Sequence, residues 1–360
     1  MKRPPLFERF NALQKHIPWI SILEKPTPVR QLTNLQKVLK TKEALWVKLD
    51  NLTSKAYGGN KVRKLEFLLA DALHQDKHTI VTMGGLGTNH GLATTIHGRT
   101  QNIHTRIYIE DQPLTPYVLQ NLKLMYYYGA ELIYTKTRWR TALRFNLFDR
   151  LRWRGVYWLP TGGSTPVGVL GYLNAVFELR NQIQAGLLPE PRLIFVAAGS
   201  VGTISGIELG LQLTGLNSRV IGIQVTSNPR FNQDRVKNLV HKTLRLLTPG
   251  IEVEKIHYEP RFELSNEFLG RGYGYPTKSG NEALEMALEF EQLHLDPTYT
   301  AKTFAGVIDY LRKGKQGPIL YWHTLNSVDL SDVASQVDYQ DLPSPFHQFF
   351  DGSSLGCTSG

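Results

Sequence analysis

Residues 193–211 read LIFVAAGSVGTISGIELGL, an apolar run followed by a glycine-rich loop and a second apolar stretch. A short, continuous apolar run that ends in glycine is typical of a strand buried on both faces of a parallel sheet. Gly199 and Gly202 allow the backbone to turn closely from this strand into the next element. Ile204–Leu213 then has helical spacing, so the segment is predicted to form one β-α unit of an α/β fold.

The same alternation of strand and helix patterns continues along the chain from Leu45. The predicted strands are Leu45–Leu49, Thr79–Met83, Thr105–Ile109, Glu131–Tyr134, Val156–Leu159, Arg192–Ala198, Arg219–Val225 and Ile319–Trp322. Apolar spacings of three and four predict helices at Val62–Leu73, Val167–Arg180, Ile204–Leu213, Glu282–Leu293 and Thr303–Leu311. The alternation is too irregular for a symmetric barrel. We therefore expect two α/β domains, each an open, mostly parallel twisted sheet flanked by helices.

Length and composition limit the class of protein. The 360 residues correspond to about two domains at roughly 150 residues each. The net charge of +10 is too modest over this length to indicate a nucleic-acid-binding protein by itself. Cys357 is the single cysteine, which excludes an intramolecular disulfide, and the histidines form no ligand pattern, so no metal site is predicted. Because no apolar run approaches a membrane span, we expect a soluble, cytoplasmic protein.

A lysine with unusual surroundings follows two glycines in Gly58-Gly59-Asn60-Lys61. The glycines and Asn60 predict a turn, and the helical pattern begins directly after Lys61. The positive end of a helix disfavours an ammonium group and so lowers a lysine's pKa. A neutral amine is a nucleophile for carbonyl groups. The alternative is a solvated lysine that merely starts a helix.

Two glycine-rich loops follow predicted strands and open helices. In Met83–Gly91, three glycines precede Thr88, Asn89 and His90, and backbone N–H groups there would suit a carboxylate. The alternative is a tight turn in which Thr88 or Asn89 only caps the helix. In Gly199–Thr203 the same arrangement suits a phosphate, although the glycine spacing does not match the dinucleotide motif. A reactive lysine, a carboxylate cradle and a phosphate cradle together point to pyridoxal 5'-phosphate and a small amino-acid substrate.

Several motifs resemble the family of D-cysteine desulfhydrase and 1-aminocyclopropane-1-carboxylate deaminase, which are tryptophan-synthase-β-like enzymes of fold type II. They are GGNKVRKLEFLLADAL, GGLGTNH, TGGSTPVGVLGY at 161–172, GYGYPT and DPTYTAK. The resemblance covers roughly residues 25 to 325. It implies pyridoxal phosphate in the cleft between two domains and a homodimer. The implied larger domain comprises 1–59 and 166–328, the smaller one 60–165, and a tail 329–360.

The resemblance also implies a role for individual residues. Lys61 would bind the cofactor covalently and take the substrate's α-proton. The other implied cofactor contacts are Asn60; Asn89, at the phenolic oxygen; Gly199, Ser200, Val201, Gly202 and Thr203, at the phosphate; and Thr300, at the pyridine nitrogen. The implied substrate contacts are Thr88, Asn89 and His90, at the carboxylate, and Tyr273 and Tyr299.

The branch of the family is indicated by two positions. Thr300 stands where the deaminases have glutamate, and His90 where they have glutamine, so elimination from the β-carbon is favoured over opening of a cyclopropane ring. For D-cysteine the products would be pyruvate, hydrogen sulfide and ammonia. The alternatives are cyclopropane deamination, β-replacement and a non-catalytic relative. Three departures from the family pattern, Thr88, Leu49–Asn51 and Leu325–Asn326, lie near the implied site.

The segment from Lys136 to Arg154 is not explained by the resemblance. It contains seven basic residues and one acid, Asp149, interleaved with Trp139, Phe145, Phe148 and Trp153. We expect an amphipathic surface helix with its aromatic residues turned inward and its arginines in solvent. Nucleic acid and membrane are therefore not expected partners, although a basic helix of this kind could bind either, or another subunit. Beyond Ser327, we expect a poorly ordered tail.

Overall fold

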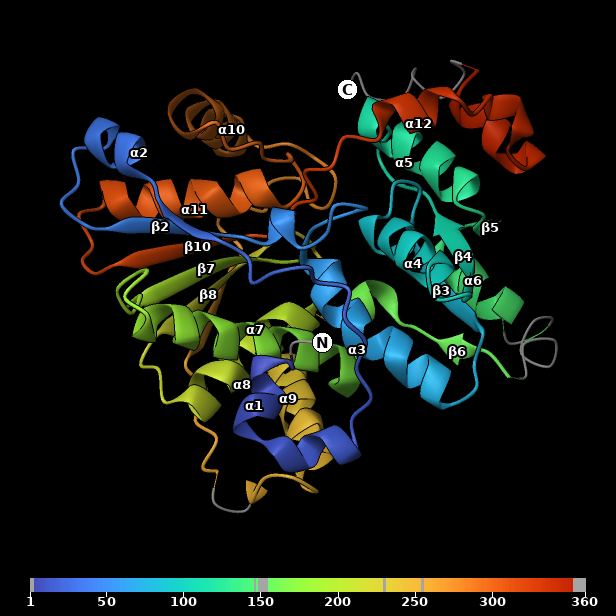
Figure 1. Ribbon diagram of the computed structural model, residues 1–360. Helices are drawn as coiled ribbons and strands as arrows, with labels where there is room; N and C mark the ends of the chain where they lie inside the picture. The colour runs from blue at the N-terminus through green and yellow to red at the C-terminus, as the bar shows by residue number, and fades with distance from the viewer. Residues whose placement is uncertain (1–2, 146, 148–154, 229–230, 254–255, 352–360) are drawn as a thin grey trace. The chain divides into compact units, whose positions relative to one another are not determined.

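The computed structural model describes residues 3–145, 147, 155–228, 231–253 and 256–351 (Figure 1). The chain forms two compact units, Met1–Leu68 with Ser164–Ser327, and Leu69–Gly163 with Val328–Gly360. The division falls inside helix α3 (Asn60–His74), whereas the sequence placed a boundary before residue 60. The reason is that Phe67, on the second turn of α3, is fully buried in a cluster of the first unit.

The first unit is built on a six-stranded sheet. Its order is β1 (Val29–Gln31), β2 (Leu45–Leu49), β10 (Ile319–His323), β7 (Leu193–Ala198), β8 (Arg219–Gln224) and β9 (Phe262–Ser265). All neighbours are parallel except β1 and β2, which are antiparallel. The predicted mostly parallel sheet is therefore confirmed. The sequence analysis missed β1 and β9, which at three and four residues are too short to show a period.

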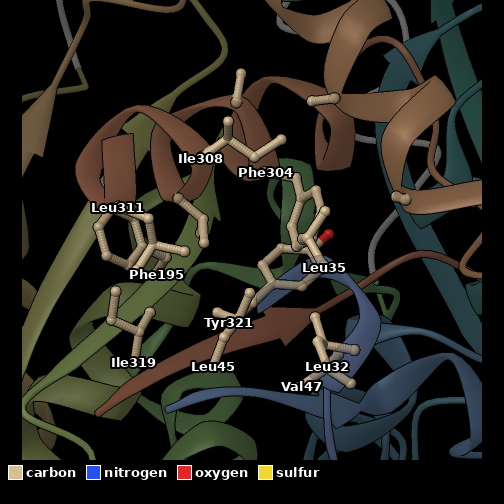
Figure 2. Close-up of a cluster of buried hydrophobic side chains, with 14 of the residues drawn as sticks. Leu32, Leu35, Leu45, Val47, Phe195, Phe304, Ile308, Leu311, Ile319 and Tyr321 are labelled. Atoms are coloured by element: carbon tan, nitrogen blue, oxygen red, sulfur yellow. The ribbon is translucent and has the colours of Figure 1, made fainter. Parts of the chain in front are cut away.

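Successive side chains of β7 enter two different hydrophobic layers, as the period of a strand requires. Leu193 and Phe195 pack with α2 (Thr33–Val38), α10 (Lys278–Glu291) and α11 (Thr300–Arg312). Ile194 and Val196 pack with α7 (Pro166–Gln184), α8 (Val201–Thr214) and α9 (Gln233–Leu247) on the other face. Figure 1 shows the two layers of helices, and Figure 2 shows the first of the two clusters, including side chains of α11 and the neighbouring strands. Both faces are covered, which explains the continuous apolar run.

The second unit holds a four-stranded parallel sheet in the order β5 (Glu131–Lys136), β4 (His104–Glu110), β3 (Thr79–Gly85), β6 (Tyr157–Trp158). Its helices include the end of α3 together with α4 (Asn89–Arg99), α5 (Pro116–Tyr127) and α6 (Arg138–Arg144). Every predicted strand of this unit is confirmed. Among the described residues, no helix has both the length and the apolar character needed to span a bilayer.

The expectation of a poorly ordered tail is wrong for residues 328–351. This segment forms α12 (Ser331–Ser335) and two short 3-10 turns, and it packs against α5 and β5. Lys123 Nζ donates to the Val337 carbonyl at 2.8 Å, and the buried Phe346 ring lies 5.7 Å from that of Tyr134, centroid to centroid. A few well-placed apolar side chains anchor the segment, despite its polar composition. Residues 352–360, including Cys357, lie outside the described ranges.

Candidate active site

Lys61 lies in the first turn of α3, which begins at Asn60, two residues before the predicted start at Val62. Gly59 adopts a φ of +91°, and a Cβ added there would lie 2.9 Å from the Thr324 carbonyl oxygen. Only glycine permits both the left-handed backbone and this close approach to the chain that follows β10. Lys61 Nζ donates a 2.7 Å hydrogen bond to Oδ1 of the neighbouring Asn60.

The amine of Lys61 is electrostatically unusual. Burial disfavours the charged form and lowers its pKa to about 8, while the nearby carboxylate of Asp296 acts in the opposite direction. The main cause is burial, whereas the sequence analysis emphasised the helix terminus. At neutral pH roughly a tenth of such amines are unprotonated, far more than for an ordinary lysine. Lys61 is therefore suited to attack a carbonyl carbon and to accept a proton.

The loop Gly199–Thr203 meets the N-terminus of α8, as predicted. Ser200 is the N-cap residue, but its side chain makes no capping hydrogen bond, and the Gly202 amide donates to Ser164 Oγ at 3.1 Å. A Cβ at Gly202 would lie 2.9 Å from Ser164 Oγ and 3.0 Å from Lys64 Nζ. Glycine is thus needed for a hydroxyl, an ammonium group and backbone amides to converge here. This donor set fits a phosphate dianion.

Lys64 was missed by the sequence analysis, although a signal was present. It stands three residues after Lys61 on α3, and residues at this spacing share one face of a helix. Its side chain is buried, and burial followed by the charge of Lys61 holds its pKa well below the usual range. A bound phosphate would provide the opposite charge that favours the ammonium form. Ser164 was also missed, because it is distant in sequence from the loop.

The two predicted tyrosines form a pair. The hydroxyl oxygens of Tyr273 and Tyr299 lie 2.5 Å apart, and their rings meet edge to face with centroids 5.6 Å apart. A Cβ at Gly199 would lie 3.0 Å from the Tyr299 ring, so this ring packs against the start of the α8 loop. The structure therefore brings both tyrosines next to the loop predicted to bind phosphate. One hydroxyl of the pair donates its hydrogen to the other.

The hydroxyl group of Thr300 is hydrogen-bonded to Asp296. Thr300 Oγ1 donates to Asp296 Oδ1 at 2.6 Å and accepts from the Asp296 amide at 2.7 Å. The same carboxylate accepts the amides of Thr298, Tyr299 and Thr300 at the start of α11. The sequence analysis treated Thr300 as a neutral group and missed the carboxylate bonded to it. Asp296 is thus a shared neighbour of Thr300 and Lys61.

At Leu325–Asn326, where the sequence departs from the family pattern, a side chain of this loop makes a hydrogen bond to the turn before Lys61. Asn326 Oδ1 accepts a 2.7 Å hydrogen bond from the Gly58 amide, in the turn that precedes Lys61. Neither Leu325 nor Asn326 has a positive φ, so this loop requires no glycine at these positions. The altered loop therefore supports the lysine turn.

The remaining predicted residues belong to the second unit. Thr88 is the N-cap of α4, and its Oγ1 accepts from the Gly91 amide at 3.2 Å. Thr88 therefore caps α4, and its hydroxyl hydrogen is still a donor that suits a carboxylate. His90 is buried in the first turn of the same helix.

Asn89 is oriented by two residues that the sequence analysis did not identify. Its Oδ1 accepts from Tyr117 Oη at 2.7 Å and from Asn121 Nδ2 at 2.9 Å, both on α5. Since the oxygen is held by two donors, the amide presents its NH₂ group as the donor on the other side. That orientation suits the hydrogen bond to a phenolic oxygen implied for Asn89. No sequence pattern links α5 to this loop, because the contact is tertiary.

The comparisons with known proteins agree with these features. A family model described as pyridoxal-phosphate-dependent enzyme matches residues 20–324. A Pyrococcus abyssi protein named "Putative 1-aminocyclopropane-1-carboxylate deaminase" is 33% identical over 88% of this chain and 94% of its own length. A Thermotoga maritima protein of the same name is 33% identical over 85% and 95%.

The fold comparison leads to the same group. The crystal structure of an "ACC deaminase homologue" has a TM-score of 0.76 and 28% identity, and the alignment covers 93% of this chain and 99% of that one. The residues of the first unit also fit the cofactor, because they supply a lysine of low pKa and a set of phosphate donors. The chain therefore belongs to the family of pyridoxal-phosphate-dependent enzymes.

Proposed function

We propose that this enzyme is a lyase that releases sulfide from D-cysteine: D-cysteine and water yield pyruvate, hydrogen sulfide and ammonia. The observation that carries the choice is Thr300, an uncharged residue at the position where the deaminases of the resembled family have glutamate. When bound, pyridoxal phosphate supplies an electron sink for the carbanion formed at the substrate α-carbon. A weaker sink favours a substrate that loses a good leaving group at the β-carbon, such as a thiolate.

The roles proposed for the chain's own residues are those that the resemblance implies, and the local geometry of each residue supports them. Lys61, with a pKa near 8, holds or accepts a proton at Nζ and acts as the base toward the α-carbon. Thr88 and the N-terminal amides of α4 bind the substrate carboxylate, and Asn89 donates to the cofactor's phenolic oxygen. The hydrogen-bonded pair Tyr273 and Tyr299 orients the substrate and delivers a proton to the departing sulfur.

A substrate panel tests this proposal. The purified enzyme loaded with pyridoxal phosphate is given D-cysteine, L-cysteine and 1-aminocyclopropane-1-carboxylate, and sulfide, ammonia and keto acid are measured. We expect equimolar sulfide, ammonia and pyruvate from D-cysteine, with at least about tenfold slower turnover of the other two substrates. Faster release of ammonia from the cyclopropane substrate would instead support the deaminase named for the two relatives.

The pKa of Lys61 predicts how cofactor capture depends on pH. Only the neutral amine attacks the aldehyde, so in the apoprotein the rate should rise about tenfold per pH unit below 8 and level off above it. Stopped-flow absorbance after mixing with pyridoxal phosphate measures this rate. Asp296→Asn should move the midpoint to lower pH, since Asp296 raises the pKa of Lys61. A midpoint near the ordinary lysine pKa of 10.5 would contradict the burial that we describe.

A further inference from the structure

Helix α6 turns an apolar stripe toward solvent. Trp139 and Leu143 on α6, together with Leu147 three residues beyond its end, recur at every fourth residue, and we call them the Trp139 stripe. Their exposed fractions are 63%, 47% and 65%. Residues at this spacing lie on one face of a helix. The expectation that the aromatic residues of this segment point inward is therefore wrong for Trp139. Phe148 and Trp153 lie outside the described residues.

The opposite face of the helix is fixed to the second unit, so the orientation is determined by specific contacts. Thr141 is fully buried, and its Oγ1 lies 2.6 Å from that of Thr135 on β5. Phe145 turns inward as predicted, and its ring lies 6.5 Å from that of Tyr108 and 4.7 Å from that of Trp158. With Thr141 and Phe145 on the inner face, helical geometry places the Trp139 stripe on the outer face.

Positive charge borders the stripe. Arg140 and Arg144 are exposed and lie one helical turn apart along one edge of the stripe. Arg138 is also exposed, but it lies away from the stripe, and its charge acts on the carboxylate of Glu110. The guanidinium of Arg140 lies 5.6 Å from the centroid of the Trp139 ring. Residues 136–147 contain no acidic residue. An exposed tryptophan and two leucines beside arginines are typical of a helix that lies in a membrane interface.

We propose that the Trp139 stripe and its flanking arginines dock this enzyme on an anionic phospholipid surface. The ring and the two leucines would enter the headgroup region, Arg140 would pair with lipid phosphates and carboxylates, and Arg144 would add positive charge beside it. A second copy of the chain is less suitable, because a symmetric contact through this helix would bring arginines of both copies together. The phosphates of a nucleic acid would pair with the arginines, but the exposed leucines would make no stacking contact with its bases.

Vesicle flotation tests the proposal with the full-length enzyme loaded with pyridoxal phosphate. We expect binding to phosphatidylcholine vesicles that contain phosphatidylserine, little binding to phosphatidylcholine alone, and weaker binding as salt is raised. Trp139→Ser with Leu143→Ser should weaken binding about tenfold or more, and so should Arg140→Gln with Arg144→Gln. Binding should also shift tryptophan fluorescence to shorter wavelength, and Trp139→Ser should remove most of this shift.

Matched control variants come from the first unit. Leu187→Ser removes a comparably exposed leucine, and Arg235→Gln with Lys242→Gln removes two exposed charges from α9. These variants should bind vesicles as the wild type does, and visible absorbance of the cofactor verifies that every variant is folded. Three results would each overturn the proposal: no preference for phosphatidylserine, a dimer that dissociates on loss of Trp139 and Leu143, or tighter binding to single-stranded RNA than to vesicles.

Discussion

Lys61→Ala is expected to abolish covalent binding of pyridoxal phosphate and to lower turnover by about 10³-fold or more. Lys61 supplies both the amine that attacks the cofactor's aldehyde and the base of the reaction, so one substitution removes two functions. Two measurements check this: the visible absorbance of the loaded protein, and the mass of the protein after borohydride reduction. The wild type should keep the cofactor's mass on the peptide that contains Lys61, and the variant should lose both signals.

The control for this variant is Lys55→Ala. Lys55 is 88% exposed in the loop before the site, and its ion pair with Glu24 is a surface contact of 3.4 Å. This variant should keep the absorbance band, the mass label and the wild-type rate. A label that persists in Lys61→Ala on another lysine, with normal turnover, would show that the cofactor lysine has been assigned wrongly.

The parts of the fold that were predicted correctly are those in which local pattern and tertiary environment agree. β2 has the predicted bounds, and β7 and β8 each differ from the prediction by one residue at an end, because continuous apolar runs have few alternatives to a buried parallel strand. The tail was predicted wrongly because its order depends on a few buried apolar side chains in a polar context, among them Val337, Leu342 and Phe346. Composition averages over a segment and therefore hides a few anchoring residues.

The residues of the candidate site also fall into two groups, those that the sequence predicted and those that it did not. Lys61 and the α8 loop were found because the sequence carries their chemistry locally, in glycines next to a strand or a helix start. Asn121 was missed because it contacts Asn89 only through the tertiary fold. Asp296 was missed although its hydrogen bonds to Thr298, Tyr299 and Thr300 are local, because the sequence does not show which of the neighbouring polar groups its carboxylate binds. The outward turn of Trp139 was missed for a related reason, since only the contacts of Thr141 and Phe145 reveal which face of α6 is buried.

The segment Leu49–Asn51, which departs from the family pattern, contributes Asp50 to a buried network of charged side chains. Asp50 is fully buried, and its carboxylate accepts hydrogen bonds from Arg63, Tyr172 and Trp322 at 2.7 to 2.8 Å. Arg63 also donates to both carboxylate oxygens of Glu178, at 3.0 and 3.1 Å, and Lys48 Nζ donates to Glu178 at 2.6 Å. Because Arg63 stands two residues from Lys61, this buried charge network also fixes the start of α3.

Glu178→Ala is expected to destabilise the first unit by about 3–5 kcal/mol, because it leaves buried cations without one of their two carboxylates. Burial alone would raise the pKa of Glu178, but the charges of Arg63 and Lys48 hold it at about 2. The Glu178 contribution is therefore complete above its ordinary pKa of 4.5 and is lost as the pH falls toward 2. Urea unfolding followed by circular dichroism measures the loss at neutral pH and across this range.

Glu282→Ala serves as the control, because it removes an ion pair that is exposed and so shows how much pairing without burial contributes to stability. Glu282 and Arg312 form an ion pair at 2.6 Å, as short as that of Glu178 and Lys48, but both side chains are 48% exposed. Removing this pair should cost about 0–1 kcal/mol, because water replaces the lost partner. If the two glutamate variants unfolded at the same urea concentration, the buried network would not stabilise the unit as we describe. A much larger loss of unfolding free energy for Glu178→Ala would show that the burial of charged groups, rather than the number of ion pairs, determines the stability of the first unit.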